Sequence, residues 1–202
     1  MQITKTLAAG MPVVVFYISG HGFGHASRQI EIIRKLQRLR NDLHIIIKTP
    51  TPRWFFDIAR LANYSFKTVE TDTGVVQPNS LQVDVVQSIR KCDSFHRTLE
   101  QRAASEAAEL KGLNVRLIVG DIPPLAFRVG TKASIPTVAI SNFTWDWIYS
   151  NYADTTACAP ELVNTLSNAY SSATMAWRFP LHAGFHSCRH VVDVPLVARR
   201  ST

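Results

Sequence analysis

The sequence predicts an α/β fold, an open parallel-sheet Rossmann-like domain with helices on both faces of the sheet. The first observation is a short, wholly apolar segment at 13–18, "VVVFYI", which is typical of a strand buried on both faces. The second is the glycine-rich loop that follows it and leads into an amphipathic helix. The third is the alternation of strand-like and helix-like segments through the rest of the 202 residues. No repeat or low-complexity linker divides the chain, so we expect a single domain over 1–202.

The elements follow in order from local patterns. After 13–18, strand-like runs of apolar and β-branched residues lie at 43–48, 65–70, 115–121, 135–141 and 174–179. Helix-like segments start near Ala26 or Ser27 and continue at 50–62, 84–111, 123–133, from about 144, and at 160–171. Residues 71–83 are expected to form a loop. The alternation predicts the strand order 3-2-1-4-5, with a sixth strand at the end, and an exposed apolar patch at the C-terminal edge.

Composition restricts the class of protein. Hydrophobic residues make up 46% of the chain and charged residues 18%, as in a soluble globular protein, and the formal net charge is +7. No basic-aromatic pattern of a nucleic-acid module is present, so we expect no nucleic-acid partner; the basic balance is compatible with weak association with a membrane surface. Three widely spaced cysteines and the lack of a long apolar run favour a cytoplasmic location.

The loop "SGHGFGHASR" carries the most chemistry. Gly20, Gly22 and Gly24 permit positive φ and close approach of the backbone to a ligand, and the helix N-terminus that follows favours an anion. A P-loop is excluded because no Gly-Lys-Ser/Thr ends the segment. A dinucleotide-binding motif is disfavoured because the second strand ends without an acidic residue. A phosphate-binding loop remains, with a plain tight turn as its alternative.

Two histidines border this loop. His21 and His25 can exchange protons with a hydroxyl or donate to a phosphate oxygen, or they can simply satisfy backbone groups of the turn. They lack a third ligand for zinc. The histidines at 182, 186 and 190 lie four apart, but Pro180 and Gly184 disfavour a regular helix there, so we expect no metal.

Further polar residues follow other strands and are expected at the same edge of the sheet. Each has a second interpretation: Asp121 could cap the next helix, Trp145 could pack in the core instead of stacking on a sugar, and Arg28 could point to solvent. The candidate phosphate- or acceptor-binding residues are Gly20, Gly22, Gly24, Arg28, Thr73, Gly74, Asp121, Asn142, Trp145 and Asp146.

Four motifs in order, "GHGFGHASR", "VGDIPPLAFRVG", "SNFTWDWIY" and "VVDVPLVARR", carry a family resemblance. Together they resemble the N-terminal glycosyltransferase-like region of L-arabinokinases and stand-alone bacterial relatives. This region belongs to the GT-B fold group, near the peptidoglycan GlcNAc transferases. The resemblance extends from about 12 to 200.

The resemblance implies the acceptor-side half of an inverting GT-B enzyme, which transfers a sugar from a nucleotide-sugar donor. His25, and as second choice His21, would be the base or a phosphate contact. The donor would be a co-substrate, and no cofactor or metal would be needed. The donor-binding domain is expected to be absent, so a partner chain or a second copy would complete a site for a sugar or glycoconjugate acceptor. The alternatives are a truncated fragment, a non-catalytic sugar- or phosphate-binding or regulatory module, and, less favoured, an NAD-type binder.

Overall fold

The computed structural model describes residues 10–198 and contains one large parallel sheet. Its strand order is β3-β2-β1-β6-β7-β8-β9, and every neighbouring pair is parallel. The strands are β1 (Val13–Ile18), β2 (His44–Thr49), β3 (Tyr64–Thr68), β6 (Val115–Asp121), β7 (Thr137–Ser141), β8 (Met175–Arg178) and β9 (Val191–Asp193). The predicted α/β class, the order 3-2-1-4-5 and the sixth strand are confirmed, and β9 extends the sheet by one more strand.

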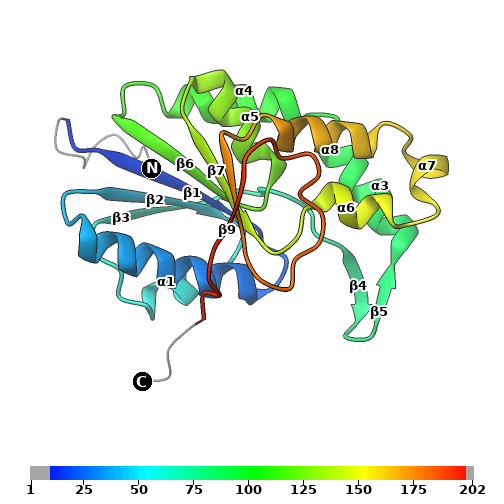
Figure 1. The fold of residues 1–202 in the computed structure, drawn as a ribbon, viewed down its shortest axis with the longest axis horizontal. Coiled ribbons are helices and arrows are strands. Elements are labelled where there is room, and N and C mark those ends of the chain that lie inside the picture. Colours follow the sequence, from blue (N-terminus) through cyan, green and yellow to red (C-terminus); the bar gives the residue numbers. More distant parts are fainter. Residues whose placement is uncertain (1–9, 199–202) are drawn as a thin grey trace.

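Helices cover both faces of this sheet (Figure 1). The helices are α1 (Phe23–Leu39), α2 (Trp54–Asp57), α3 (Val85–His96), α4 (Leu99–Glu109), α5 (Pro124–Ala133), α6 (Trp145–Ser150), α7 (Thr155–Cys158) and α8 (Leu162–Ser171). One apolar core joins the sheet to α3, α4, α5, α6 and α8, and a second joins it to α1 and α2. Alternate side chains of β1 enter the two cores, which explains why this strand is apolar throughout. None of the helices in the described part of the chain is long and apolar enough to span a membrane.

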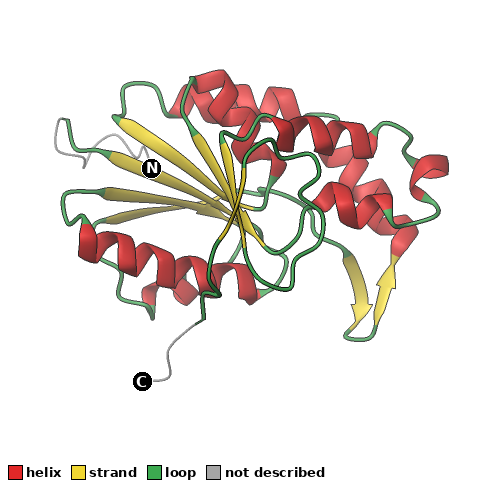
Figure 2. Cartoon of the chain, viewed as in Figure 1, coloured by secondary structure: helices red, strands yellow, loops and turns green. Residues whose placement is uncertain are grey.

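Four sequence predictions about the elements were wrong. The helix predicted over 50–62 is limited to α2 (Trp54–Asp57). Part of the predicted loop 71–83 is an antiparallel hairpin, β4 (Val76–Asn79) and β5 (Gln82–Asp84), which projects from the body of the molecule (Figure 2). The predicted helix 84–111 is two helices, because the Thr98 hydroxyl donates to the Phe95 carbonyl at 3.0 Å and the chain turns there. Helix α1 begins at Phe23, before the predicted start, directly after Gly22 with φ +77°.

A buried ion cluster supports the end of β2. Lys48 is fully buried, and its Nζ donates to Glu106 Oε2 at 2.5 Å and to Glu109 Oε2 at 3.0 Å. The Tyr17 hydroxyl also donates to Glu106, at 2.8 Å. Charged groups seldom lie this deep unless they are paired, so this cluster ties β1 and β2 to α4.

The carboxyl ends of β1, β6 and β7 bring distant segments together. The backbone N–H of Ser19 donates to the Asp121 carbonyl at 2.8 Å, which joins the first loop to the end of β6. The Thr71 hydroxyl donates to the Ile18 carbonyl at 2.9 Å and so attaches the segment after β3 to the same edge. In parallel α/β sheets this edge is where ligands bind, so we sought the functional site there.

Candidate functional site

The Asp121 carboxylate is the centre of the polar cluster at this edge. It is fully buried and lies within hydrogen-bond distance of three side chains of the first turns of α1. His25 Nδ1 lies 2.8 Å from Oδ1, while Arg28 Nε at 2.6 Å and Gln29 Nε2 at 2.7 Å reach Oδ2. A further nitrogen of Arg28 contacts Oδ1. The alternative role as a cap for α5 is wrong, because Pro123 occupies the N-cap position of that helix.

The charges around Asp121 explain its protonation state. Burial by itself raises the pKa of this carboxyl group, but its electrostatic interactions and hydrogen bonds with His25 and Arg28 outweigh burial. The pKa of Asp121 therefore lies below its ordinary value, and the group is a carboxylate at neutral pH. A buried carboxylate held in this way stabilises positive charge on the groups that face it.

Arg28 points inward to this carboxylate. Its remaining guanidinium nitrogens donate to Asn142 Oδ1 and to the Ser141 hydroxyl, both at 3.0 Å. Its side chain is 17% exposed and lies over the ring of Phe179. The alternative that Arg28 points to solvent is therefore wrong, because the buried Asp121 attracts the guanidinium. A role of Arg28 in phosphate or acceptor binding stays a prediction.

His25 lies within the first turn of α1 and is only 6% exposed, so the ring does not line an open pocket. Its Nδ1 lies close both to Asp121 Oδ1 and to an Arg28 nitrogen, at 2.9 Å from the latter. The ring packs edge-on against Phe143, with centroids 5.7 Å apart. Within residues 10–198 no group is bonded to Nε2, and this atom is not among the enclosed unpaired ones, so it keeps contact with solvent.

Two tautomers of His25 fit these contacts. If Nδ1 carries the proton, it donates to Asp121 and leaves a lone pair on Nε2 that can accept a proton. If Nδ1 is unprotonated, it accepts a hydrogen bond from Arg28, and Nε2 carries the proton. The first arrangement makes His25 a base, and the second does not.

Asp72 is a buried acid at this edge that the sequence reasoning missed. It accepts hydrogen bonds from the Ser19 hydroxyl at 3.0 Å and from Trp145 Nε1 at 2.9 Å. Burial raises its pKa, against the opposing effect of the Ser19 hydrogen bond. The carboxyl group thus connects the first loop to α6. Its place directly after a strand, in a segment already expected at the edge, was the available signal.

His21 is half-buried and lies against the segment after β3. Its ring meets Trp145 edge-on, with centroids 5.6 Å apart. Gly74 has φ +58°, and a Cβ at this position would lie 2.6 Å from His21 Nδ1, so a glycine is required. Burial, and then the charge of His25, lowers the pKa of His21, which favours a neutral imidazole. Thr73, beside Gly74, is partly buried.

The predicted sugar-stacking role of Trp145 is wrong. This indole is 3% exposed and lies in the core, where Asp72 accepts its N–H. Asp146 is also buried, and it accepts from the Ser167 and Ser187 hydroxyls rather than facing the loop that contains His25. The neighbouring Trp147 is 36% exposed instead.

The glycine loop itself is exposed at Gly20, Gly22 and Gly24. The Gly22 N–H donates to the Gly20 carbonyl at 2.9 Å, so that one donor of the loop is already used internally. A Cβ at Gly20 would lie 2.3 Å from Pro50, which requires glycine there. Binding of an anion by the remaining N–H groups stays a prediction.

In the described part of the chain, no group of three His, Cys, Asp or Glu side chains is arranged to hold a metal ion.

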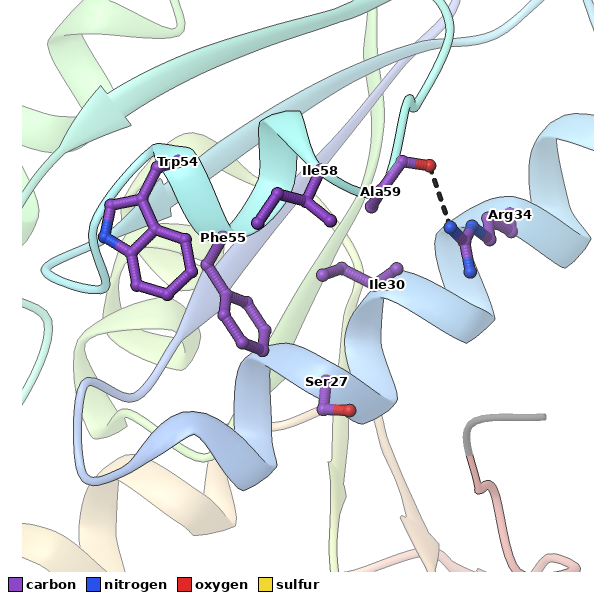
Figure 3. Close-up of a pocket in the computed structure, with 7 residues that line it drawn as sticks. All are labelled: Ser27, Ile30, Arg34, Trp54, Phe55, Ile58 and Ala59. Carbon is purple, nitrogen blue, oxygen red and sulfur yellow. Dashed lines mark hydrogen bonds between the residues drawn. The ribbon is translucent and has the colours of Figure 1, made fainter. Parts of the chain in front are cut away.

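An apolar cavity of about 140 Å³ lies beside this loop, between α1 and α2 (Figure 3). Ile30 of α1, Phe55 of α2 and Ile58, which directly follows α2, point into it. Phe23, at the start of α1, stacks on Phe55 with centroids 4.8 Å apart and is 49% exposed, and Trp54 is 54% exposed. Large apolar side chains are thus exposed at the start of α1 and of α2, and the expected apolar patch at the C-terminal edge stays a prediction.

Comparisons with known proteins identify a relative along most of the chain. L-arabinokinase from Arabidopsis thaliana is 31% identical over 192 residues, which are 93% of this chain and 18% of that protein. The chain is homologous to part of L-arabinokinase. It spans less than a fifth of the length of that relative. No family model matches the sequence.

Solved structures with a similar fold include UDP-glycosyltransferases. A UDP-glucosyltransferase from Polygonum tinctorium superposes with a TM-score of 0.58 and 13% identity, over 97% of this chain and 55% of its own. Phytolacca americana UGT2 superposes with a TM-score of 0.53 and 12% identity, over 96% of this chain and 56% of its own. These likenesses show a glycosyltransferase-like, GT-B-type Rossmann fold. They give no support for the expected nearness to the peptidoglycan GlcNAc transferases.

Proposed function

We propose that this chain is the acceptor-side lobe of an inverting GT-B glycosyltransferase, with His25 as its base. The observation that carries the proposal is the 2.8 Å contact between His25 Nδ1 and Asp121 Oδ1 at the ligand-binding edge of the sheet, where no residue of 10–198 is bonded to Nε2. A histidine held by a buried carboxylate is a common arrangement for proton abstraction. The shared fold of UDP-glycosyltransferases supports the reaction class.

In the proposed reaction Nε2 takes the proton of an acceptor hydroxyl as its oxygen attacks the anomeric carbon of a UDP-sugar. The bond from that carbon to the diphosphate breaks, UDP leaves, and attack from the opposite side inverts the configuration. Asp121 holds the Nδ1 proton and stabilises the imidazolium that forms. Loss of such a base costs about 10²–10⁴-fold in rate.

The donor would be bound by a second lobe, supplied by another domain, a partner chain or a second copy. The exposed aromatic surface at Phe23 and Trp54 supports this part of the proposal, because it lies at the edge where a facing lobe would pack. A cluster of large apolar side chains exposed to water is costly on an isolated domain. The acceptor is proposed to be a sugar or a glycoconjugate.

A second candidate function is a non-catalytic sugar- or phosphate-binding module. It is favoured by one observation, the 2.9 Å approach of Arg28 to His25 Nδ1. If Arg28 donates there, Nε2 carries the proton and cannot accept another from a hydroxyl. The Asp121 carboxylate then serves only to hold α1 in place.

The test is UDP release from a panel of UDP-sugars and hydroxyl acceptors. The chain is assayed alone and joined to the donor-binding lobe of a UDP-glycosyltransferase of similar fold, with thermal unfolding used to show that both lobes are folded. We expect transfer only with both lobes, and a loss of about 10²–10⁴-fold in His25→Gln. A folded, donor-binding pair that transfers nothing, or whose activity is unchanged by His25→Gln, would favour the non-catalytic module.

A further inference from the structure

A second, polar cavity lies beyond the carboxyl end of β7. It has a volume of about 190 Å³ and opens between α6, α8 and the segment 184–187. The residues that line it include Asp146, Trp147, Ser150, Ser167, His186 and Ser187. The proposed transfer reaction uses none of these groups.

Asp146 is a buried carboxyl group with no cationic partner among residues 10–198. It is 6% exposed, and its Oδ1 accepts the Trp147 backbone N–H at 2.9 Å. Its Oδ2 accepts the hydroxyls of Ser167, at 3.0 Å, and Ser187. A carboxylate has about four acceptor positions, so three bonds leave capacity for one more donor. Burial without a cation is costly, and a ligand that donates a hydrogen bond would reduce this cost.

The hydroxyl groups around Asp146 are oriented as acceptors toward a ligand. Ser167 and Ser187 use their protons on the carboxylate, and Ser150 donates its own to the Trp147 carbonyl at 2.8 Å. Each oxygen therefore retains lone pairs and has no proton left to give. These acceptors select a ligand with several O–H donors, while His186 and the Trp147 indole in the same lining offer N–H groups to ligand oxygens, so the lining suits hydroxyl groups, which both donate and accept.

Trp147 supplies an apolar surface beside these acceptors. It is 36% exposed, whereas Trp145 two positions earlier is buried. An indole offers a large rigid face and an N–H donor, which within the described residues has no bonded partner. Acceptors next to an exposed indole match a ring that carries hydroxyls on its rim and C–H groups on its face.

The opposite wall of the cavity is held in place by close packing. Gly184 has φ +85°, and a Cβ there would lie 2.4 Å from Thr144 Oγ1 and 2.8 Å from Trp147 Cβ. The backbone N–H of Ala183 donates to the Asn142 carbonyl at 2.8 Å. The segment 184–187 is thus packed directly against the start of α6, and the cavity exists before any ligand arrives, which lowers the entropic cost of binding.

We propose that this cavity is a binding site for a sugar or polyol of monosaccharide size. Ligand hydroxyls would donate to Asp146 and to the serine oxygens, and the ring face would lie on Trp147. A cavity of about 190 Å³ suits one small ring. The inference does not depend on the proposed transfer reaction, and its test measures binding alone.

The experiment is a titration of the full chain with glucose, galactose, arabinose, myo-inositol and glycerol, followed by NMR of the backbone amides. We expect saturable shifts at 146–150 and 184–187 for at least one ring polyol, with a Kd on the order of 1 mM. Trp147→Leu should weaken binding by about tenfold, and Ser187→Ala should also weaken it. Trp177→Leu is the matched control, because Trp177 is 37% exposed and does not line this cavity, and it should leave binding unchanged.

Circular dichroism of each variant shows whether its fold is intact. The proposal is overturned if no ring polyol gives saturable shifts at these residues, or if folded Trp147→Leu binds as tightly as the parent chain. It is also overturned if ammonium or alkali cations, titrated separately, shift the same amides while polyols do not. Because no transfer is measured, failure here leaves the role of His25 untouched.

Discussion

Replacing Asp121 with asparagine tests the centre of the candidate site. The substitution keeps the shape of the side chain but removes the charge. It also places an amide NH₂ where an oxygen now accepts. Arg28 donates to both oxygens of this group, and Gln29 donates to one of them. In Asp121→Asn at least one donor must therefore face another donor, and Arg28 loses its charged partner.

Removing one partner of a buried ion pair costs about 3–5 kcal/mol of stability. The lower end of this range applies here, because Arg28 is 17% exposed and keeps its bonds to Asn142 and Ser141. For a domain of this size 1 kcal/mol shifts Tm by about 2–4 °C. We therefore expect Asp121→Asn to lower Tm by about 6–12 °C.

Thermal and urea unfolding of the parent chain and the variant measure this difference. Asp93→Asn is the control, because Asp93 pairs with Arg97 at the surface and such pairs contribute less than about 1 kcal/mol. The pKa of Asp121 is lowered by folding, so its stabilisation is present above the unfolded pKa and disappears as pH falls through the folded pKa. The difference between parent and variant should shrink in the same direction. A loss in Asp121→Asn no larger than that in Asp93→Asn would refute the reasoning.

Three further predictions concern stability. Burial lowers the pKa of His96 to about 4, so the free energy of unfolding should fall by about 3 kcal/mol as the pH is lowered from 6.5 to 4. In urea unfolding, the free energy of unfolding of His96→Phe should depend less steeply on pH. An equal slope of unfolding free energy against pH in the parent chain and in His96→Phe would contradict this. Gly74→Ala should cost about 1–2 kcal/mol in thermal unfolding, because φ is positive and the new Cβ meets His21; a neutral change would show that the loop adapts. Lys48→Met should lower the free energy of unfolding in urea by about 3–5 kcal/mol, because it leaves buried carboxylates without their cation. Adding Glu106→Gln should restore part of this loss. No recovery would mean that packing, not charge, stabilises the cluster.

The sequence was sufficient to predict the parallel sheet and the edge of the sheet at which the candidate site lies. Strands buried on both faces are short apolar runs, and their alternation with helices leaves few topologies open. That reasoning placed His25, Asp121 and Asn142 at one edge, and the structure joins them through Arg28. It could not supply the pairing itself, because Asp121 is 96 residues from His25 and side-chain direction depends on packing.

Local sequence patterns did not predict side-chain burial or short elements that depend on contacts with distant residues. Trp145 and Trp147 lie two apart on a short helix and so face different ways, and no periodicity within six residues decides which one is buried. The hairpin that ends at Asp84 was missed because its strands are short and mostly exposed, and thus lack an apolar pattern. Lys48 reads as a surface residue at the end of a strand, and only the distant acids of α4 explain its burial.

The protonated nitrogen of His25 distinguishes a base from a structural histidine most directly. Nitrogen-15 NMR of the imidazole side chains at neutral pH reports which ring nitrogen carries the proton, and His25→Gln assigns the signals. The proposed function predicts an N–H at Nδ1, donated to Asp121, and a bare Nε2. An N–H at Nε2, with Nδ1 accepting from Arg28, would contradict it.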